Sequence, residues 1–97
     1  MANKHIGTKF DDFLQEEGLL AETEALALKN IFSWEISKAM KEQGLTKSEI
    51  AKKIGTSRTA FDRFLDPKNI SVTLKSLEKT AIALGKRISI EIRDAAS

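Results

Sequence analysis

Four polar residues share one face of a predicted short helix and carry the hydrogen-bonding groups that DNA base edges recognise. These residues are Arg58, Thr59, Asp62 and Arg63. Arginine pairs with guanine in the major groove, threonine pairs with several bases, and a carboxylate accepts a hydrogen bond from cytosine. We expect Arg58 and Thr59 to contact bases and Arg63 to contact either a base or a phosphate. Two roles are open for Asp62: a contact to cytosine, or an ion pair with Arg58 four residues earlier.

A second set of residues is suited to bind the DNA backbone. Thr46, Lys47 and Ser57 lie at predicted helix starts, where free backbone amides attract phosphates. Lys68 adds a positive charge in the loop after Pro67. We therefore expect these four residues to fix the position of the protein on DNA, whereas the first set reads the base sequence.

Both sets lie on residues 46–65, which predict two short helices joined by a tight turn. Thr46 and Glu49 have the spacing of a capping box, Gly55 suits a left-handed helix end, and Ser57 offers a second cap. The apolar residues of the two helices are Ile50, Ala51, Ile54, Phe61, Phe64 and Leu65. The pattern is typical of a DNA-binding helix-turn-helix, and an ordinary helical hairpin with a solvated polar face is the alternative.

This part of the chain resembles the Xre/Cro-type helix-turn-helix of bacterial and phage repressors. The shared frame is Leu45-Thr46-Lys47, Ile50-Ala51, Gly55-Thr56-Ser57 and Phe61-Asp62-Arg63. Lys47 stands where glutamine is usual, and Phe61 stands where a smaller aliphatic residue is usual. The resemblance implies a mostly helical, lambda-repressor-like domain that acts as a transcriptional repressor.

The wider chain is similar to small HigA-like antitoxins of toxin–antitoxin operons. The similarity rests on the start at residues 10–14, the long helix before the motif and the ending at residues 84–92. It implies an autoregulating antitoxin that also neutralises a small basic toxin of the RNA-cleaving RelE/HigB type. Two other functions remain open: a stand-alone regulator of the same fold, and a protein-interaction module that does not bind DNA.

The net charge of +2 hides a separation of acidic and basic residues along the chain. Residues 10–28 contain six acidic residues and no lysine or arginine, whereas residues 29–97 contain 14 basic and 8 acidic residues. DNA attracts the second part and repels the first. We therefore divide the chain into an acidic N-terminal segment, residues 1–24, and a DNA-binding domain, residues 25–97.

The acidic segment mixes apolar anchors with carboxylates at Phe10, Asp11, Asp12, Phe13 and Leu14. These residues either belong to an ordinary short helix packed on the domain or form a docking surface for the toxin, and the resemblance favours docking. We predict that the short helix covers residues 10–17 and stops at Gly18.

Two more helices complete the predicted core. The first covers residues 22–43, and Trp34 lies off its apolar stripe, where it covers a dimer neighbour, holds the acidic segment or stays half-buried. The second begins after a Thr73 cap and stops at Gly85. The residues predicted to face inward are Leu28, Phe32, Ile36, Ala39 and Met40 in the first helix and Leu74, Leu77, Ala81 and Leu84 in the second.

Residues 87–93 alternate strictly between apolar and polar residues and predict a single β-strand with Ile88, Ile90 and Ile92 on one face. Because the chain offers no second strand, we expect an antiparallel ribbon across the two-fold axis of a homodimer. The alternatives are a tail lying on the helices or pairing with residues 4–7. A dimer places two recognition helices about 34 Å apart, which suits a palindromic operator on double-stranded DNA.

Composition restricts the remaining classes of function. The 97 residues make one domain, and the absence of cysteine excludes disulfides and thiolate metal sites and fits the cytoplasm. We expect no enzyme, no cofactor and no metal, because His5 is the single histidine and no glycine-rich phosphate loop occurs. No apolar run reaches the roughly 18 residues that a membrane span needs.

Overall fold

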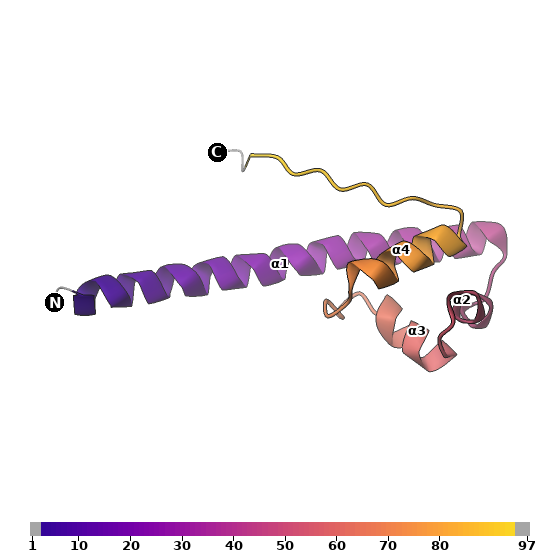
Figure 1. The fold of residues 1–97 in the computed structure, drawn as a ribbon, viewed down its shortest axis with the longest axis horizontal. Coiled ribbons are helices and arrows are strands. Elements are labelled where there is room, and N and C mark those ends of the chain that lie inside the picture. Colours follow the sequence, from indigo (N-terminus) through magenta and orange to yellow (C-terminus); the bar gives the residue numbers. More distant parts are fainter. Residues whose placement is uncertain (1–2, 95–97) are drawn as a thin grey trace.

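The computed structural model describes residues 3–94, with side chains from Gly18 onward. It contains α1 (Asn3–Gln43), α2 (Lys47–Ile54), α3 (Arg58–Leu65) and α4 (Leu74–Ala83). The long α1 runs through the whole molecule, and the three short helices gather along its C-terminal part (Figure 1). The chain is thus mostly helical, as the sequence predicts.

The single helix α1 covers both helices that the sequence predicts at residues 10–17 and 22–43. The predicted stop at Gly18 is wrong, because α1 passes through this residue without a break. Glycine weakens a helix by about 1 kcal/mol relative to alanine but does not force it to end. Gly44, Gly55 and Gly85 differ from Gly18 in having positive φ angles, and each of them follows a helix.

The core lies where the short helices meet residues 29–43 of α1. Its buried apolar side chains are Ile36, Ala39, Met40, Ile50, Ala51, Phe61, Leu65, Ala81 and Leu84. The predicted stripe on α1 is confirmed except at Leu28, which is 66% exposed. Lys29 and Ser33 are buried instead, because they share the helical face of Ile36, which successive steps of three and four residues define.

Helix α4 begins and ends as the sequence predicts. The Thr73 hydroxyl accepts a hydrogen bond from the Ser76 amide, and Gly85 follows the helix with φ 70°. Leu77 is half-buried, but Leu74 is exposed, so the prediction that it faces inward is wrong. Leu74 lies in the first turn and at the edge of the face that buries Thr80, Ala81 and Leu84, which leaves its side chain in solvent.

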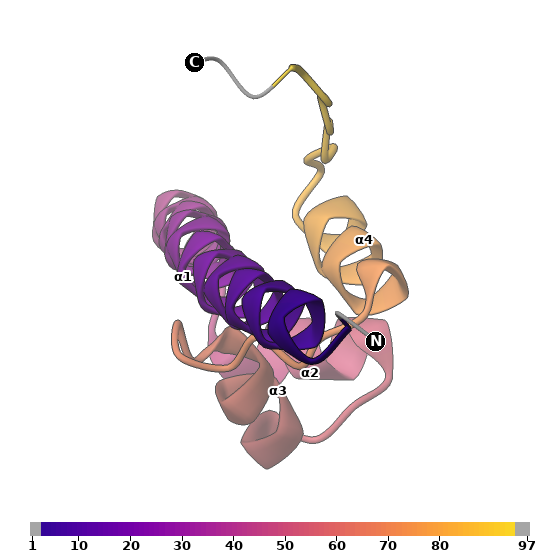
Figure 2. The ribbon, with the colours of Figure 1, turned by 90° about the vertical axis from the view of Figure 1, so that its left-hand side faces the viewer.

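After Gly85 the chain runs back above α1 as an extended segment (Figure 1). No strand is assigned to residues 3–94, and residues 4–7 lie in α1, so they do not pair with this segment. Ile88 is half-buried, whereas Ile90 and Ile92 are 69% and 93% exposed. Seen along α1, the segment leads away from α4 (Figure 2). The pairing of residues 87–93 with the same residues of a second copy therefore stays a prediction.

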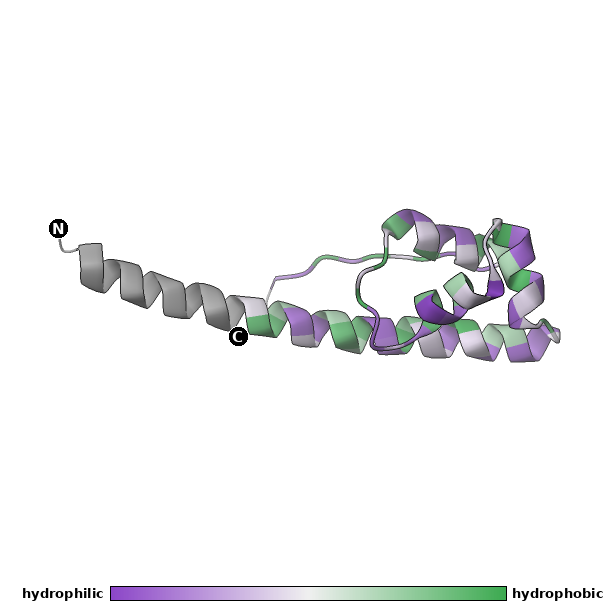
Figure 3. Ribbon diagram, turned by 90° about the horizontal axis from the view of Figure 1, so that it is seen from below, coloured by the Kyte–Doolittle hydropathy of each residue, from purple (hydrophilic) through white to green (hydrophobic). Residues whose placement is uncertain are grey.

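Figure 3 shows that polar and apolar residues are mixed around each helix in the coloured part of the chain. Over the part of the chain that the structure describes, no helix combines the length and the apolar character needed to cross a membrane.

Candidate nucleic-acid interface

The start of α2 is fixed by the predicted capping box. The Glu49 amide donates to the Thr46 hydroxyl over 3.1 Å, and the Thr46 amide donates to the Glu49 carboxylate over 2.8 Å. The hydrogen bond from the Thr46 backbone lowers the pKa of Glu49. This reciprocal pair satisfies two amides that would otherwise lack partners at the helix start.

A three-residue turn connects α2 to α3. Gly55 adopts φ 76°, and the next amide, that of Thr56, donates to the Ala51 carbonyl over 2.9 Å. No atom lies within 4 Å of a Cβ built on Gly55, so the constraint here is the backbone conformation and not the space. The Ser57 hydroxyl then accepts from the Ala60 amide over 3.1 Å and caps α3.

Aromatic packing fixes the orientation of α3. Phe61 is 1% exposed, and its ring stacks on Phe64 with the ring centroids 6.0 Å apart. Phe64 in turn meets Phe32 of α1 edge to face at 5.7 Å. Because this face of α3 is held against the core, the opposite face is solvent-exposed along its whole length. That face carries all four residues predicted to contact bases: Arg58, Thr59, Asp62 and Arg63.

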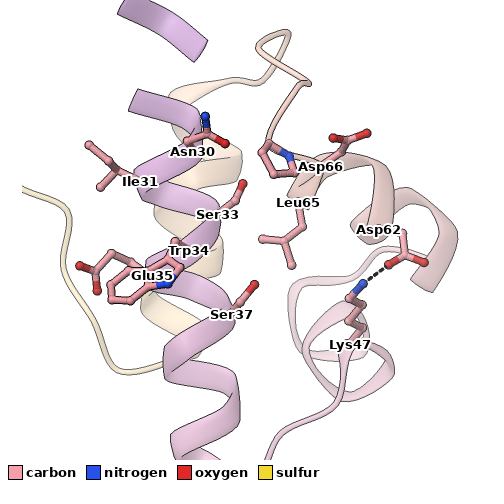
Figure 4. Close-up of a pocket in the computed structure, with 11 residues that line it drawn as sticks. Asn30, Ile31, Ser33, Trp34, Glu35, Ser37, Lys47, Asp62, Leu65 and Asp66 are labelled. Carbon is pink, nitrogen blue, oxygen red and sulfur yellow. Dashed lines mark hydrogen bonds and ion pairs between the residues drawn. The ribbon is translucent and has the colours of Figure 1, made fainter. Parts of the chain in front are cut away.

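Asp62 pairs with Lys47 and not with Arg58, so the predicted ion pair within α3 is wrong, whereas the contact to cytosine stays a prediction. Its carboxylate lies 2.6 Å from the Lys47 Nζ atom, and this ion pair joins the first turn of α2 to the middle of α3 (Figure 4). The hydrogen bond from Lys47 lowers the pKa of Asp62, and the Arg58 charge adds to this effect. Sequence reasoning missed the pair because the two residues are 15 positions apart and belong to different helices.

Lys29 has no predicted role, but the structure shows it buried beneath the end of α3. It is only 4% exposed, and its Nζ atom donates to the carbonyls of Phe64, Asp66 and Asn69 over 2.5, 2.7 and 2.8 Å. Burial lowers the pKa of Lys29, and the nearby Asp66 carboxylate opposes that shift. The ammonium group thus binds the C-terminal end of α3, where free carbonyls favour a cation.

A signal for Lys29 was present in the sequence. The residue precedes Phe32 by three positions and Ile36 by seven, which places it on the predicted buried face of its helix. A lysine at such a position needs partners for its charge. The carbonyls that supply them lie 35 to 40 residues further along the chain, and only the folded structure brings them together.

The loop after α3 is held in place by further hydrogen bonds. The Asn69 side-chain amide donates to the Arg63 carbonyl over 3.0 Å, and the Lys68 amide donates to the Asp66 carboxylate over 3.0 Å. The side chain of Lys68 remains exposed. Lys29 and Asn69 together therefore fix the position of Lys68 relative to the end of α3.

The predicted phosphate-binding residues lie at three places, the starts of α2 and α3 and the loop after α3. Thr46 and Ser57 are exposed at the starts of α2 and α3, and Lys47, the first residue of α2, is half-buried. Lys68 lies apart from these three, beyond the opposite end of α3. The residues predicted to dock a toxin lie outside the described side chains: Phe10, Asp11, Asp12, Phe13 and Leu14.

A groove of about 930 Å³ separates α1 from the C-terminal end of α3 (Figure 4). Ser33, Leu65 and Pro67 line it, with the Lys47–Asp62 pair at one end. The Ser33 hydroxyl is buried and has no hydrogen-bond partner in the part of the chain that is described. The groove has mixed polar and apolar walls, and Glu35 and Asp66 also line it.

No family model, curated protein or solved structure matches this chain. The described residues contain no group of three or more histidine, aspartate or glutamate side chains that could hold a metal ion. The candidate site is therefore defined by its own geometry: an exposed face on α3 with two arginines, flanked by two capped helix starts and a fixed loop.

Proposed function

We propose that the chain is a sequence-specific DNA-binding transcriptional repressor. In this proposal α2 and α3 form a helix-turn-helix of the Xre/Cro type within a lambda-repressor-like domain. The observation that carries the proposal is the exposed face of α3, on which Arg58, Thr59 and Arg63 stand opposite the buried Phe61 and Leu65. A helix presented in this way fits the major groove, where base pairs expose distinct hydrogen-bonding patterns.

Each residue of the site has a proposed role. Arg58 and Thr59 contact bases, because they begin the helix and face solvent. Arg63 contacts a base or a phosphate one turn further along. Within the described residues neither arginine forms an ion pair, so both guanidinium groups are free to bind DNA.

The remaining residues position the protein on the DNA backbone. The helix starts at Thr46 and Ser57 bind phosphates through their amides, and Lys68 contacts the backbone beyond the end of α3. The ion pair of Lys47 with Asp62 neutralises both charges in the free protein. Lys47 binds phosphate, or Asp62 binds cytosine, when this pair opens.

We further propose that the repressor is an autoregulating antitoxin in the cytoplasm. Its acidic segment, which includes residues 10–14, docks a small basic toxin of the RelE/HigB type, and its operator is palindromic. Homodimerisation through Ile88, Ile90 and Ile92 forms the two-stranded ribbon. The exposure of Ile90 and Ile92 in the single chain supports this contact.

Two alternatives use the same fold. A stand-alone regulator differs only in having no toxin. A protein-interaction module without DNA binding is favoured by the Lys47–Asp62 pair, because the pair removes one positive charge from the proposed DNA-binding surface.

Titration with salt separates DNA binding from the interaction module. Affinity for the DNA upstream of the chain's own gene is measured by fluorescence anisotropy at several salt concentrations. For each phosphate that the protein neutralises, log affinity falls with a slope of about −0.9 against log salt. We expect a slope of about −3.6, from four phosphates neutralised by Arg63, Lys68 and their two-fold copies. A flat line contradicts the repressor.

Co-expression separates the antitoxin from the stand-alone regulator. The chain is produced together with the product of the neighbouring gene, and copurification of a small basic protein supports the antitoxin. A test variant replaces Asp11 and Asp12 with lysine, which removes negative charge from the proposed docking surface, and the wild type is the control. Equal recovery of the partner with this variant and the wild type contradicts the proposed docking surface.

A further inference from the structure

An exposed apolar row runs along the side of α1 opposite its buried face, and two of its members, Ile31 and Trp34, also line the edge of the groove beside α3. Leu20, Ile31 and Trp34 belong to this row and are 54%, 60% and 60% exposed, with Ala27 between them. Their positions differ from the buried face around Ile36 by about half a helical turn, at about 100° per residue. In Figure 4, Ile31 extends from α1 on the side away from α3.

The spacing of this row is that of a coiled-coil seam. Positions 20, 24, 27, 31, 34 and 38 follow one another in alternating steps of four and three residues. Such a repeat keeps one face of a helix in contact with a second helix over several turns. We call these six positions the α1 seam.

The first part of the seam lies on residues 18–28 of α1, which bury no side chain against the rest of the molecule. Lys29 is the first buried side chain along the described part of α1, and it donates to the Phe64 carbonyl at the end of α3. A single helix in water is marginally stable, because most helical stability in proteins comes from packing of an apolar face. A second helix against the seam supplies that packing.

Charge complementarity identifies the second helix and its direction. Glu24 and Lys38 are both seam positions, seven residues before and seven residues after Ile31. In a parallel pair each of these residues faces its own copy, so like charges meet twice. In an antiparallel pair centred on Ile31, Glu24 of each copy meets Lys38 of the other, and opposite charges meet twice.

The position of the Lys38 side chain agrees with a place at the seam. Its Nζ atom lies 5.0 Å from the centre of the Trp34 ring, which belongs to the same row. The lysine thus lies over the apolar surface that a second helix would cover, and a carboxylate from that helix can reach it.

We propose that the α1 seam binds a second copy of this chain in antiparallel orientation. The contact is two-fold symmetric and is distinct from the ribbon proposed for residues 87–93. It does not require DNA binding, so its test is made on the protein alone.

The first test measures self-association of the full chain by sedimentation equilibrium without DNA. Replacing Ile31 with glutamate places a charge in the centre of the seam, and we expect the dimer dissociation constant to rise about tenfold or more. The control is Leu74→Glu, because Leu74 is similarly exposed at 66% but lies on α4. Circular dichroism confirms that both variants keep their helices. Equal dissociation constants for the two variants, or a wild type that stays monomeric, overturn the proposal.

The second test determines the direction of the pair. Glu24→Lys and Lys38→Glu each replace two attractive contacts by two repulsive ones, and we expect each to raise the dissociation constant by about tenfold. The double variant restores the attraction. Fourteen residues of helix hold the two positions about 21 Å apart within one chain, so a restored dimer reports contact between chains. Single variants that dimerise as well as the wild type overturn the antiparallel seam.

The ribbon is separated from the seam by repeating these measurements in an Ile90→Lys background. This change disturbs the proposed ribbon and leaves α1 unaltered. The differences between seam variants persist in this background if the seam is an interface of its own. If the seam variants no longer differ in dissociation constant in this background, the α1 seam is not an interface. This result does not depend on the affinity for DNA.

Discussion

Replacing Lys29 with methionine removes an ammonium group that donates to three backbone carbonyls. The methionine side chain has a similar length and fills the same space, so the change tests the hydrogen bonds and not the packing. The carbonyls of Phe64, Asp66 and Asn69 lose a shared partner in a site where the lysine is 4% exposed. Each buried carbonyl without a partner costs about 1–3 kcal/mol.

Part of that cost is offset, because the variant no longer has to remove an ammonium ion from water. Water that reaches the carbonyls reduces the cost further. We therefore expect Lys29→Met to lower the free energy of unfolding by about 2–4 kcal/mol, within the range that breaking a buried polar network produces. For a domain of this size that is a substantial fraction of a total of about 5–15 kcal/mol.

The assay is urea denaturation followed by circular dichroism. The control is Lys75→Met, because Lys75 is exposed in the first turn of α4, and its loss should change stability by less than about 0.5 kcal/mol. Hydrogen exchange provides a second readout: the Asn69 and Ser71 amides, whose partners lie in this loop, should exchange faster in the variant. A Lys29→Met protein as stable as the control would refute the reasoning.

Three further predictions concern the site itself. Gly55→Ala should lower the free energy of unfolding by about 1–2 kcal/mol, because φ 76° is strained for alanine; unchanged urea denaturation contradicts this. The lowered pKa of Asp62 means that its contribution to stability is complete above about pH 4 and is lost as the pH falls through its folded pKa. Asp62→Asn should therefore lose less stability than the wild type on acidification, and parallel pH curves would count against the Lys47 pair. Asp62→Ala should also free Lys47 for phosphate and make the salt slope of DNA binding steeper by about 0.9 per subunit, or about 1.8 for the dimer; an equal slope means that Lys47 does not reach the backbone.

Local signals predicted the elements of the site correctly. The capping box at Thr46, the left-handed Gly55 and the Ser57 cap depend on residues within four positions of each other, and all three are confirmed. The exposure of the polar face of α3 follows from the period of its buried residues, Phe61 and Leu65.

Features that depend on distant residues could not be predicted. Glycine often ends helices, which is why the sequence predicts a stop at Gly18. The neighbouring residues do not show whether the backbone adopts the positive φ that ends a helix. Leu28 and Leu74 are apolar and lie at the edges of buried faces, where only the position of neighbouring helices decides exposure. The partners of Lys29 and Asp62 come from other helices, so their contacts required the folded chain.

The central claim is that α3 reads DNA through its exposed arginines, and Arg58→Ala tests it most directly. Anisotropy at matched salt compares binding to the DNA upstream of the gene with binding to a scrambled fragment, and Lys86→Ala serves as a control that removes one charge away from α3. If the claim is right, Arg58→Ala keeps its helicity and loses about 1–3 kcal/mol of preference for the upstream DNA, whereas Lys86→Ala keeps that preference. Equal preference in Arg58→Ala and the wild type would contradict the claim.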